Sequence, residues 1–234
     1  MKQEFIHIDF MDNILKGPSF SKNDKPSKLM VMLHGYGDNA ENFINLAQPI
    51  DQDDWEMHYI SLNAPTIMKE NMSGYQWFDL YPGGVYIADA GPKEYELITQ
   101  EIDIAVSKLK NTINFYLEQL QLKFNDCFVM GFSQGGIITF ELARKMNVAL
   151  AGIGILSGRI IQKDEKPNIF LQETPIFISH GRNDDVLPVL NFKKSIEYLN
   201  KNNYRFESHL IDGDSHTISP NTINLFQNYI KKNI

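Results

Sequence analysis

The chain has 234 residues, of which 43% are apolar and 12% aromatic, so it can bury one sizeable core and is not a disordered chain. Its net charge of −7, with no Lys/Arg cluster longer than the Lys231–Lys232 pair, disfavours nucleic-acid binding. Residues 1–17 have no apolar core of signal-peptide length, no run approaches the roughly 18 apolar residues of a membrane span, and Cys127 is the single cysteine. We therefore expect a cytoplasmic protein with no transmembrane segment and no internal disulfide.

The first part of the chain predicts two buried strands, a helix between them and a long loop. The unbroken apolar run LMVML indicates a strand over 29–33 that is buried on both faces. The HGYGDN turn leads into a helix over about 40–50, and MHYISLNAP predicts a second strand. Residues 66–92 are rich in Gly, Pro, Tyr, Trp and Met and show no period. A compact domain keeps a loop of that length mainly where the loop has a function, such as covering a site.

The rest of the chain predicts a regular alternation of helices and strands. From 94 to about 122 apolar residues recur at the helical period, which predicts one long helix or two abutting ones. The following elements are expected in this order: strand 127–132, helix 134–146, strand 151–156, strand 174–180, helix 190–201, strand 205–211 and helix 220–231. The alternation predicts a single α/β domain over 1–234, with a mostly parallel central sheet and helices on both of its faces.

A motif typical of nucleophilic serines lies between an expected strand and an expected helix. Gly131-Phe132-Ser133-Gln134-Gly135 matches G-x-S-x-G. A serine lifted above the edge of a sheet needs a tight turn, and a helix that starts at that turn aims free N–H groups at a developing oxyanion. The alternative is an ordinary glycine-rich turn. The position of the motif favours the catalytic interpretation.

A serine nucleophile needs a base, and the base needs a carboxylate that orients it. Of the six histidines, His58 and His209 fall inside predicted strands, where a structural role is more typical. Hydrolases with this serine motif place the acid and then the histidine after the serine, which indicates His216, in GDSHTISP, as the base. HGRNDDVLP supplies Asp184 and Asp185 as candidate acids, and spacing alone ranks Asp184 only slightly above Asp185.

Two backbone N–H groups are expected to form the oxyanion hole. One belongs to Gln134, the residue after the serine, and the other to a loop that follows an earlier strand. In LHGYGDN, Gly35 and Gly37 leave the backbone of Tyr36 free to turn its N–H inward. A glycine turn capped by Asp38 is the alternative here.

The residues of the 66–92 loop suggest how a substrate is held. Methionines and aromatic rings suit a groove for short or medium acyl chains, and we expect Met72, Trp77 and Tyr81 to contact the substrate. The alternative, that they seal the core beneath a long loop, stays open. Cys127 lies inside an expected strand and is predicted to be a buried packing residue.

Taken in order between residues 29 and 216, the segments HGYGDNAENF, QWFDL, GFSQGG, HGRNDDVLP and GDSH resemble the phospholipase/carboxylesterase family, which includes the acyl-protein thioesterases. The resemblance implies an α/β-hydrolase fold without a large cap domain, and neither a metal nor an organic cofactor. The family pattern has an aspartate three residues after the glycine of its HG element, which implies Asp184 as the acid. It likewise implies Ser133 as the nucleophile, His216 as the base, and Tyr36 and Gln134 as the oxyanion donors.

The resemblance also bears on the substrate. Trp77 matches the Trp-Phe-Asp element that lies close to the substrate groove of the family. Residues 80–92 depart from the pattern of the eukaryotic thioesterases and are closer to the bacterial carboxylesterase members. This departure leaves the natural substrate open.

The sequence therefore predicts a serine carboxylesterase that cleaves short- to medium-chain acyl esters or thioesters through an acyl-enzyme. The substrate is expected to be a small acyl ester or thioester, a lipid or an acylated protein. Acyl-protein thioesterase or lysophospholipase activity is the alternative, and a peptidase or lactone hydrolase would use the same residues. A binding protein built on a hydrolase scaffold and a homodimer also stay open.

Overall fold

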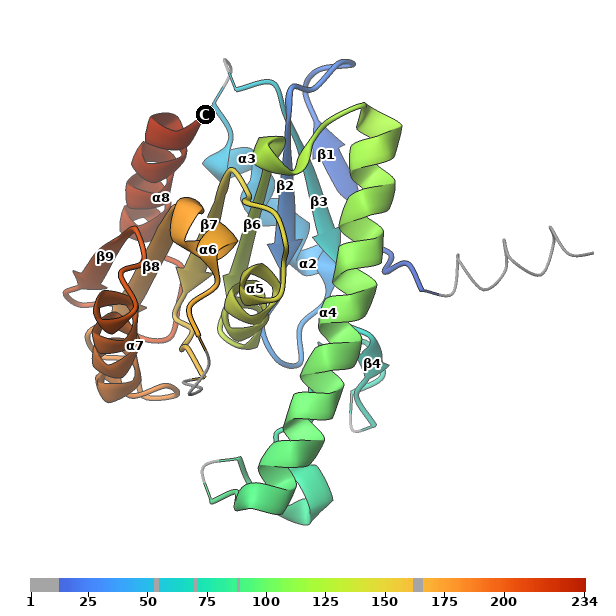
Figure 1. Cartoon of the computed structure of the whole chain (residues 1–234). Helices are drawn as coiled ribbons and strands as arrows, with labels where there is room; N and C mark the ends of the chain where they lie inside the picture. The colour runs from blue at the N-terminus through green and yellow to red at the C-terminus, as the bar shows by residue number, and fades with distance from the viewer. Residues whose placement is uncertain (1–12, 53–54, 70, 88, 162–165) are drawn as a thin grey trace, which may run out of the picture.

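The computed structural model describes residues 13–52, 55–69, 71–87, 89–161 and 166–234. Its centre is a seven-stranded sheet with the strand order β1-β3-β2-β6-β7-β8-β9 (Figure 1). The strands are β1 (Ser19–Ser21), β2 (Lys28–Leu33), β3 (Met57–Leu62), β6 (Cys127–Phe132), β7 (Gly152–Leu156), β8 (Ile176–Gly181) and β9 (Phe206–Ile211). Strand β1 is antiparallel to β3, and the other neighbours are parallel. The mostly parallel sheet is thus confirmed.

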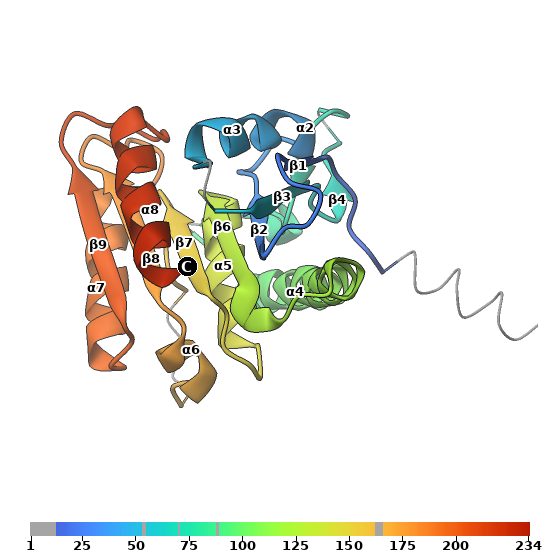
Figure 2. The ribbon, with the colours of Figure 1, turned by 90° about the horizontal axis from the view of Figure 1, so that it is seen from above.

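Helices cover both faces of the sheet, as the alternation predicts (Figure 2). One face carries α4, α5, α6 and α7, and the other carries α2, α3 and α8. The helices are α2 (Ala40–Phe43), α3 (Ala47–Ile50), α4 (Pro92–Leu120), α5 (Gln134–Arg144), α6 (Ile169–Glu173), α7 (Val189–Lys201) and α8 (Pro220–Asn233). The described part of the chain contains no helix that is both long and apolar enough to cross a membrane.

Strand β2 shows why an unbroken apolar run forms a central strand. Leu29, Val31 and Leu33 belong to the core beneath α4 and α5, whereas Met30 and Met32 belong to the core beneath α3 and α8. All five side chains are fully buried. Because successive side chains of a strand point to opposite faces, a strand between two helical layers needs apolar residues at every position.

The structure differs from the sequence prediction in three elements. The helix expected over 40–50 consists of α2, a 3₁₀ turn η1 (Ile44–Leu46) and α3. Pro49 has no N–H to donate to the carbonyl four residues earlier, which weakens regular α-helical bonding there. Strand β1 and helix α6 were not predicted, because neither segment is long enough to show a period.

The long loop and the long helix lie together at one end of the sheet. The helix expected over 94–122 is the single helix α4, whose N-terminal half extends past the carboxyl ends of the parallel strands (Figure 1). The 66–92 loop contains the short pair β4 (Thr66–Ile67) and β5 (Tyr75–Gln76) and a 3₁₀ turn η2 (Pro82–Gly84), which contacts α4. A third 3₁₀ turn, η3 (Phe124–Asp126), joins α4 to β6.

Candidate active site

The topology brings the predicted site residues to the carboxyl edge of the parallel strands. Ser133 follows β6 directly, Asp184 lies in the loop after β8, and His216 lies in the loop after β9. Strand β2 is the neighbour of β6, with Leu33 opposite Gly131, so the loop that begins at residue 34 runs beside Ser133. Open parallel sheets bind ligands among the loops at this edge, at the point where the order of the strands reverses direction.

Ser133 occupies a strained turn. Its φ of 53° and ψ of −115° are uncommon for a residue with a side chain, and its N–H donates to the carbonyl of Leu156 at 2.8 Å. Helix α5 begins at the next residue. A Cβ atom at Gly135 would lie 2.1 Å from the carbonyl oxygen of Leu33, so only glycine lets the helix start this close to β2.

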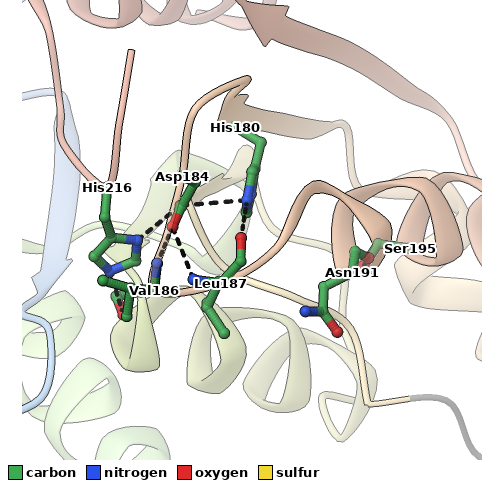
Figure 3. A network of polar contacts seen from close by, with 8 residues as sticks. His180, Asp184, Val186, Leu187, Asn191, Ser195 and His216 are labelled. Carbon is green, nitrogen blue, oxygen red and sulfur yellow. Dashed lines mark hydrogen bonds and ion pairs between the residues drawn. The ribbon is translucent and has the colours of Figure 1, made fainter.

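Ser133, His216 and Asp184 form a continuous hydrogen-bonded chain, and Figure 3 shows the part of it between His216 and Asp184. His216 Nε2 lies 2.9 Å from Ser133 Oγ, and its Nδ1 lies 2.7 Å from Asp184 Oδ2. The Asp184 side chain is fully buried, whereas that of His216 is 14% exposed. The ring of Phe132 packs on the imidazole at a centroid distance of 4.8 Å. With Nδ1–H bonded to the carboxylate, Nε2 carries the lone pair that faces the serine hydroxyl.

The second oxygen of Asp184 is fixed by its own loop. Oδ1 accepts from the N–H groups of Val186 at 3.0 Å and Leu187 at 2.7 Å. His180, at the end of β8, donates from Nε2 to the Leu187 carbonyl at 2.7 Å and lies 3.3 Å from Asp184 Oδ2 (Figure 3). Asp185 is exposed. The geometry therefore separates the two aspartates that spacing alone did not.

The loop that carries His216 is held against the loop that carries Asp184. The N–H of Asn183 donates to the carbonyl of Asp214 at 2.8 Å. A Cβ atom at Gly181 would lie 2.2 Å from the carbonyl of Ser215, so the two loops approach more closely than any other residue would permit. These contacts fix the distance between the imidazole and the carboxylate.

A buried histidine braces the loop that contains Tyr36. His34 Nε2 accepts from the N–H of Ala64 at 3.1 Å, so the ring proton is on Nδ1, which donates to the carbonyl of Gly35 at 2.7 Å. Burial lowers the pKa of His34, against smaller opposing effects of the Gly35 carbonyl and of Asp38. A neutral His34 thus supports the backbone beside Ser133.

Gln134 links the serine turn to the 66–92 loop through its side chain. Its Oε1 accepts from the N–H of Trp77 at 2.9 Å, and its Nε2 donates to the carbonyl of Phe78 at 2.7 Å. The indole N–H of Trp77 donates to the carbonyl of His34 at 2.9 Å. The backbone N–H of Gln134 is at the first position of α5, where a helix offers no acceptor for it.

A cavity of about 530 Å³ opens over Ser133 and His216. Tyr36 and Gln134 belong to its wall, so both predicted oxyanion residues adjoin the serine. Its other walls are largely apolar and come from the 66–92 loop, from α5 and from the loop that precedes α7: Phe78, Leu80, Tyr86, Ile87, Ile137, Val186, Leu187 and Pro188. Such a space suits an acyl chain.

The three side chains predicted to contact the substrate are not among the described residues that line this cavity. Trp77 is buried beneath it, with 1% of its surface exposed, and has the core role that the sequence left open. Met72 and Tyr81 are on the surface, 84% and 53% exposed. Sequence reasoning identified the loop but not its cavity-facing residues, since a loop without a period gives no signal for which side chains face inward.

Two further observations concern residues away from the serine. Cys127 is buried in β6, and burial raises the pKa of its thiol. Its placement agrees with the predicted packing role. Over the described ranges, no three His, Cys, Asp or Glu side chains gather closely enough to hold a metal ion.

Comparison with known proteins gives one consistent result. Residues 20–234 match the family model described as Phospholipase/Carboxylesterase. The chain is 24% identical to acyl-protein thioesterase 1 of Debaryomyces hansenii, over 94% of this chain and 97% of that protein. It is 26% identical to acyl-protein thioesterase 1 of Saccharomyces cerevisiae, over 88% of this chain and 92% of that protein.

Solved structures share the fold at low sequence identity. The crystal structure of esterase PE8 has a TM-score of 0.80 and 24% identity, and the similarity covers 94% of this chain and all of that one. The Bacillus cereus carboxylesterase has a TM-score of 0.77 and 16% identity, over 97% of this chain and 99% of that one. The α/β-hydrolase fold expected from the sequence is confirmed.

Proposed function

Because the chain belongs to the phospholipase/carboxylesterase family and is an ester hydrolase, we propose that it cleaves short- to medium-chain acyl esters or thioesters through an acyl-enzyme formed on Ser133. The observation that carries this proposal is the hydrogen-bonded chain from Ser133 Oγ through His216 to Asp184 at the floor of an apolar cavity. A solvent-facing serine with these partners has the base and the orienting carboxylate that nucleophilic catalysis needs.

In the proposed mechanism, His216 moves the protons. Its Nε2 accepts the hydroxyl proton as Ser133 Oγ attacks the substrate carbonyl, and returns that proton to the departing alcohol or thiol. Water then attacks the acyl-enzyme in the same way and releases the acid. Asp184 keeps the imidazole in the Nδ1–H tautomer and stabilises its positive charge, which it can do because its other oxygen is held by two backbone N–H groups.

The tetrahedral oxyanion is stabilised by the backbone of Gln134 and Tyr36 in this proposal. The N-terminus of α5 adds its positive dipole end at the same place. Such donors stabilise best when they do not move during the reaction. The bonds that His34 and the Gln134 side chain make to neighbouring backbone hold both segments in position before substrate binds.

The acyl group lies in the apolar cavity, whose volume of about 530 Å³ suits a short or medium chain. The names of the yeast relatives favour a second candidate within the same chemistry, hydrolysis of a thioester on an acylated protein. Both candidates use the same residues and differ in the leaving group.

The test is kcat/KM for 4-nitrophenyl esters from acetate to decanoate beside matched acyl thioesters, with Ser133→Ala as the blank. We expect a maximum at short or medium chains that disappears in the variant. A preference for thioesters of the same acyl group would favour protein deacylation. Turnover that persists in Ser133→Ala would refute Ser133 as the nucleophile.

A further inference from the structure

Arg159 stands where the proposed acyl cavity meets a second space. It lines the cavity over Ser133 and also an adjoining cavity of about 490 Å³. Asn191, in the first turn of α7, likewise lines both. The second cavity lies against the start of α4, at Tyr95 and Thr99. A substrate that fills the first cavity therefore passes Arg159 and Asn191 if it extends into the second.

The backbone around Arg159 is fixed without any ligand. Strand β7 ends in a turn at Ser157, whose φ is 44° and whose N–H donates to a neighbouring strand. On the other side of Arg159, the N–H of Ile160 donates to the buried hydroxyl of Ser195 at 2.9 Å. Ser195 in turn donates to the carbonyl of Asn191 at 2.8 Å. These bonds hold the backbone of Arg159 and that of Asn191 at a set separation. Binding of a ligand between them therefore costs little backbone conformational entropy.

The charge of Arg159 has no counterpart in the part of the chain that the structure describes. As a whole residue Arg159 is half-buried, and its guanidinium forms no ion pair with any described carboxylate. Asp38 is the one carboxylate among the described lining residues of the first cavity, and it accepts a hydrogen bond from Asn42 at 2.9 Å. Partly desolvated arginines usually have an anionic partner, because the planar guanidinium binds carboxylates through two parallel hydrogen bonds.

We infer that Arg159, assisted by the Asn191 amide, binds a carboxylate carried by the ester substrate. The carboxylate is either at the far end of the acyl chain, as in a monoester of a dicarboxylic acid, or on the leaving group. The apolar walls take the intervening carbon chain, and Arg159 selects anionic substrates over neutral ones of the same length. This inference rests on the proposed function, since it assigns the substrate class of that same site.

The test compares two matched substrate pairs in wild type, Arg159→Gln and Arg159→Lys. Mono-4-nitrophenyl adipate against 4-nitrophenyl hexanoate places the carboxylate on the acyl side. 4-(Hexanoyloxy)benzoate against 4-(hexanoyloxy)benzamide places it on the leaving group. The quantity measured is the ratio of kcat/KM for the anionic to the neutral member of each pair, because general effects of a substitution divide out. Lys193→Gln removes an exposed charge from α7 outside both cavities and is the matched control.

We expect Arg159→Gln to lower this ratio by about tenfold or more for one of the two pairs, the size expected for a lost hydrogen-bonded ionic contact. Arg159→Lys should retain part of the ratio, and Lys193→Gln should leave it unchanged. The pair that responds identifies the side of the ester that carries the carboxylate. Ratios that are the same in wild type and Arg159→Gln for both pairs would overturn the inference.

A binding measurement separates this inference from the proposed function. Calorimetry would compare monomethyl adipate, which is anionic, with neutral dimethyl adipate on Ser133→Ala and on the double variant Ser133→Ala/Arg159→Gln. If wild type hydrolyses no ester, the proposed function fails. The inference would still be supported if Ser133→Ala binds monomethyl adipate more tightly than dimethyl adipate and the double variant does not. Equal binding of both compounds in the two variants, together with unchanged ratios for the 4-(hexanoyloxy)benzoate pair, would reject it.

Discussion

Asp184→Asn is the substitution that tests the proposed site most sharply, because the two oxygens of Asp184 have different partners. Oδ1 accepts from two backbone N–H groups, and Oδ2 faces His216 Nδ1 at 2.7 Å. An asparagine that keeps its oxygen on the backbone donors must direct its NH₂ group at Nδ1. The imidazole then has to carry its proton on Nε2, where it points at Ser133 Oγ and cannot accept the hydroxyl proton.

The opposite orientation of the amide is not a favourable alternative. Turning the oxygen towards His216 would direct the NH₂ group at the N–H groups of Val186 and Leu187. Each buried donor left without an acceptor costs about 1–3 kcal/mol. The inactive tautomer should therefore prevail, and kcat/KM should fall about 10⁴-fold, or about 5 kcal/mol of transition-state stabilisation.

The assay is steady-state hydrolysis of 4-nitrophenyl hexanoate, with the free energy of unfolding measured in urea on the same samples. Asp185→Asn is the matched control, because the neighbouring carboxylate is exposed and should leave the rate unchanged. A loss confined to Asp185→Asn would move the acid to that residue. If Asp184→Asn kept its rate within tenfold of wild type, the tautomer argument would be refuted.

Two further predictions concern the supports of the site. Gln134→Leu should lower the free energy of unfolding in urea by about 2–3 kcal/mol, because it leaves buried partners in the segment 77–78 unpaired; an unchanged midpoint would contradict this. Burial lowers the pKa of His34, so the unfolded chain takes up a proton near pH 6.5 that the folded chain does not. The free energy of unfolding should therefore fall as the pH drops below about 6.5, by up to about 1.4 kcal/mol per pH unit. In His34→Gln, the free energy of unfolding measured in urea should fall less steeply with pH. Equal slopes in the two proteins would argue against a neutral His34.

The elements that could be predicted from sequence are those with a strong local signal. Strand β2 is apolar at every position because both of its faces are covered, and the serine motif is recognisable because a tight turn between strand and helix requires glycine. Strand β1 and helix α6 have three and five residues, too few to show a period. Their structure depends on pairing with β3 and on packing against α5, which are contacts distant in sequence.

The candidate site shows the same division between local and distant signals. Ser133 and His216 stand out by motif and order along the chain. Spacing alone ranked Asp184 only slightly above Asp185 as the acid. The difference between them depends on which side chain turns towards His216, in the loop after β9, and this is a contact distant in sequence. The residues that line the cavity were harder still to predict. Trp77 belongs to a segment that adjoins the cavity, but it does not line the cavity, and its indole N–H donates to the carbonyl of His34. Arg159 lies in no motif, and only the meeting of two cavities draws attention to it.

The side chain of Gln134 connects the proposed acyl cavity and the proposed oxyanion site by hydrogen bonds. The backbone of this residue begins α5 beside Ser133, while its side chain is bonded on both sides to the segment 77–78 that forms a cavity wall. Trp77 extends the link to His34, which braces the loop of Tyr36. A displacement of the cavity wall by a substrate of unsuitable length should therefore also move the two proposed oxyanion donors. Because catalysis depends on donors that are in place before charge develops, chain-length selection by this enzyme should be expressed in kcat as well as in KM.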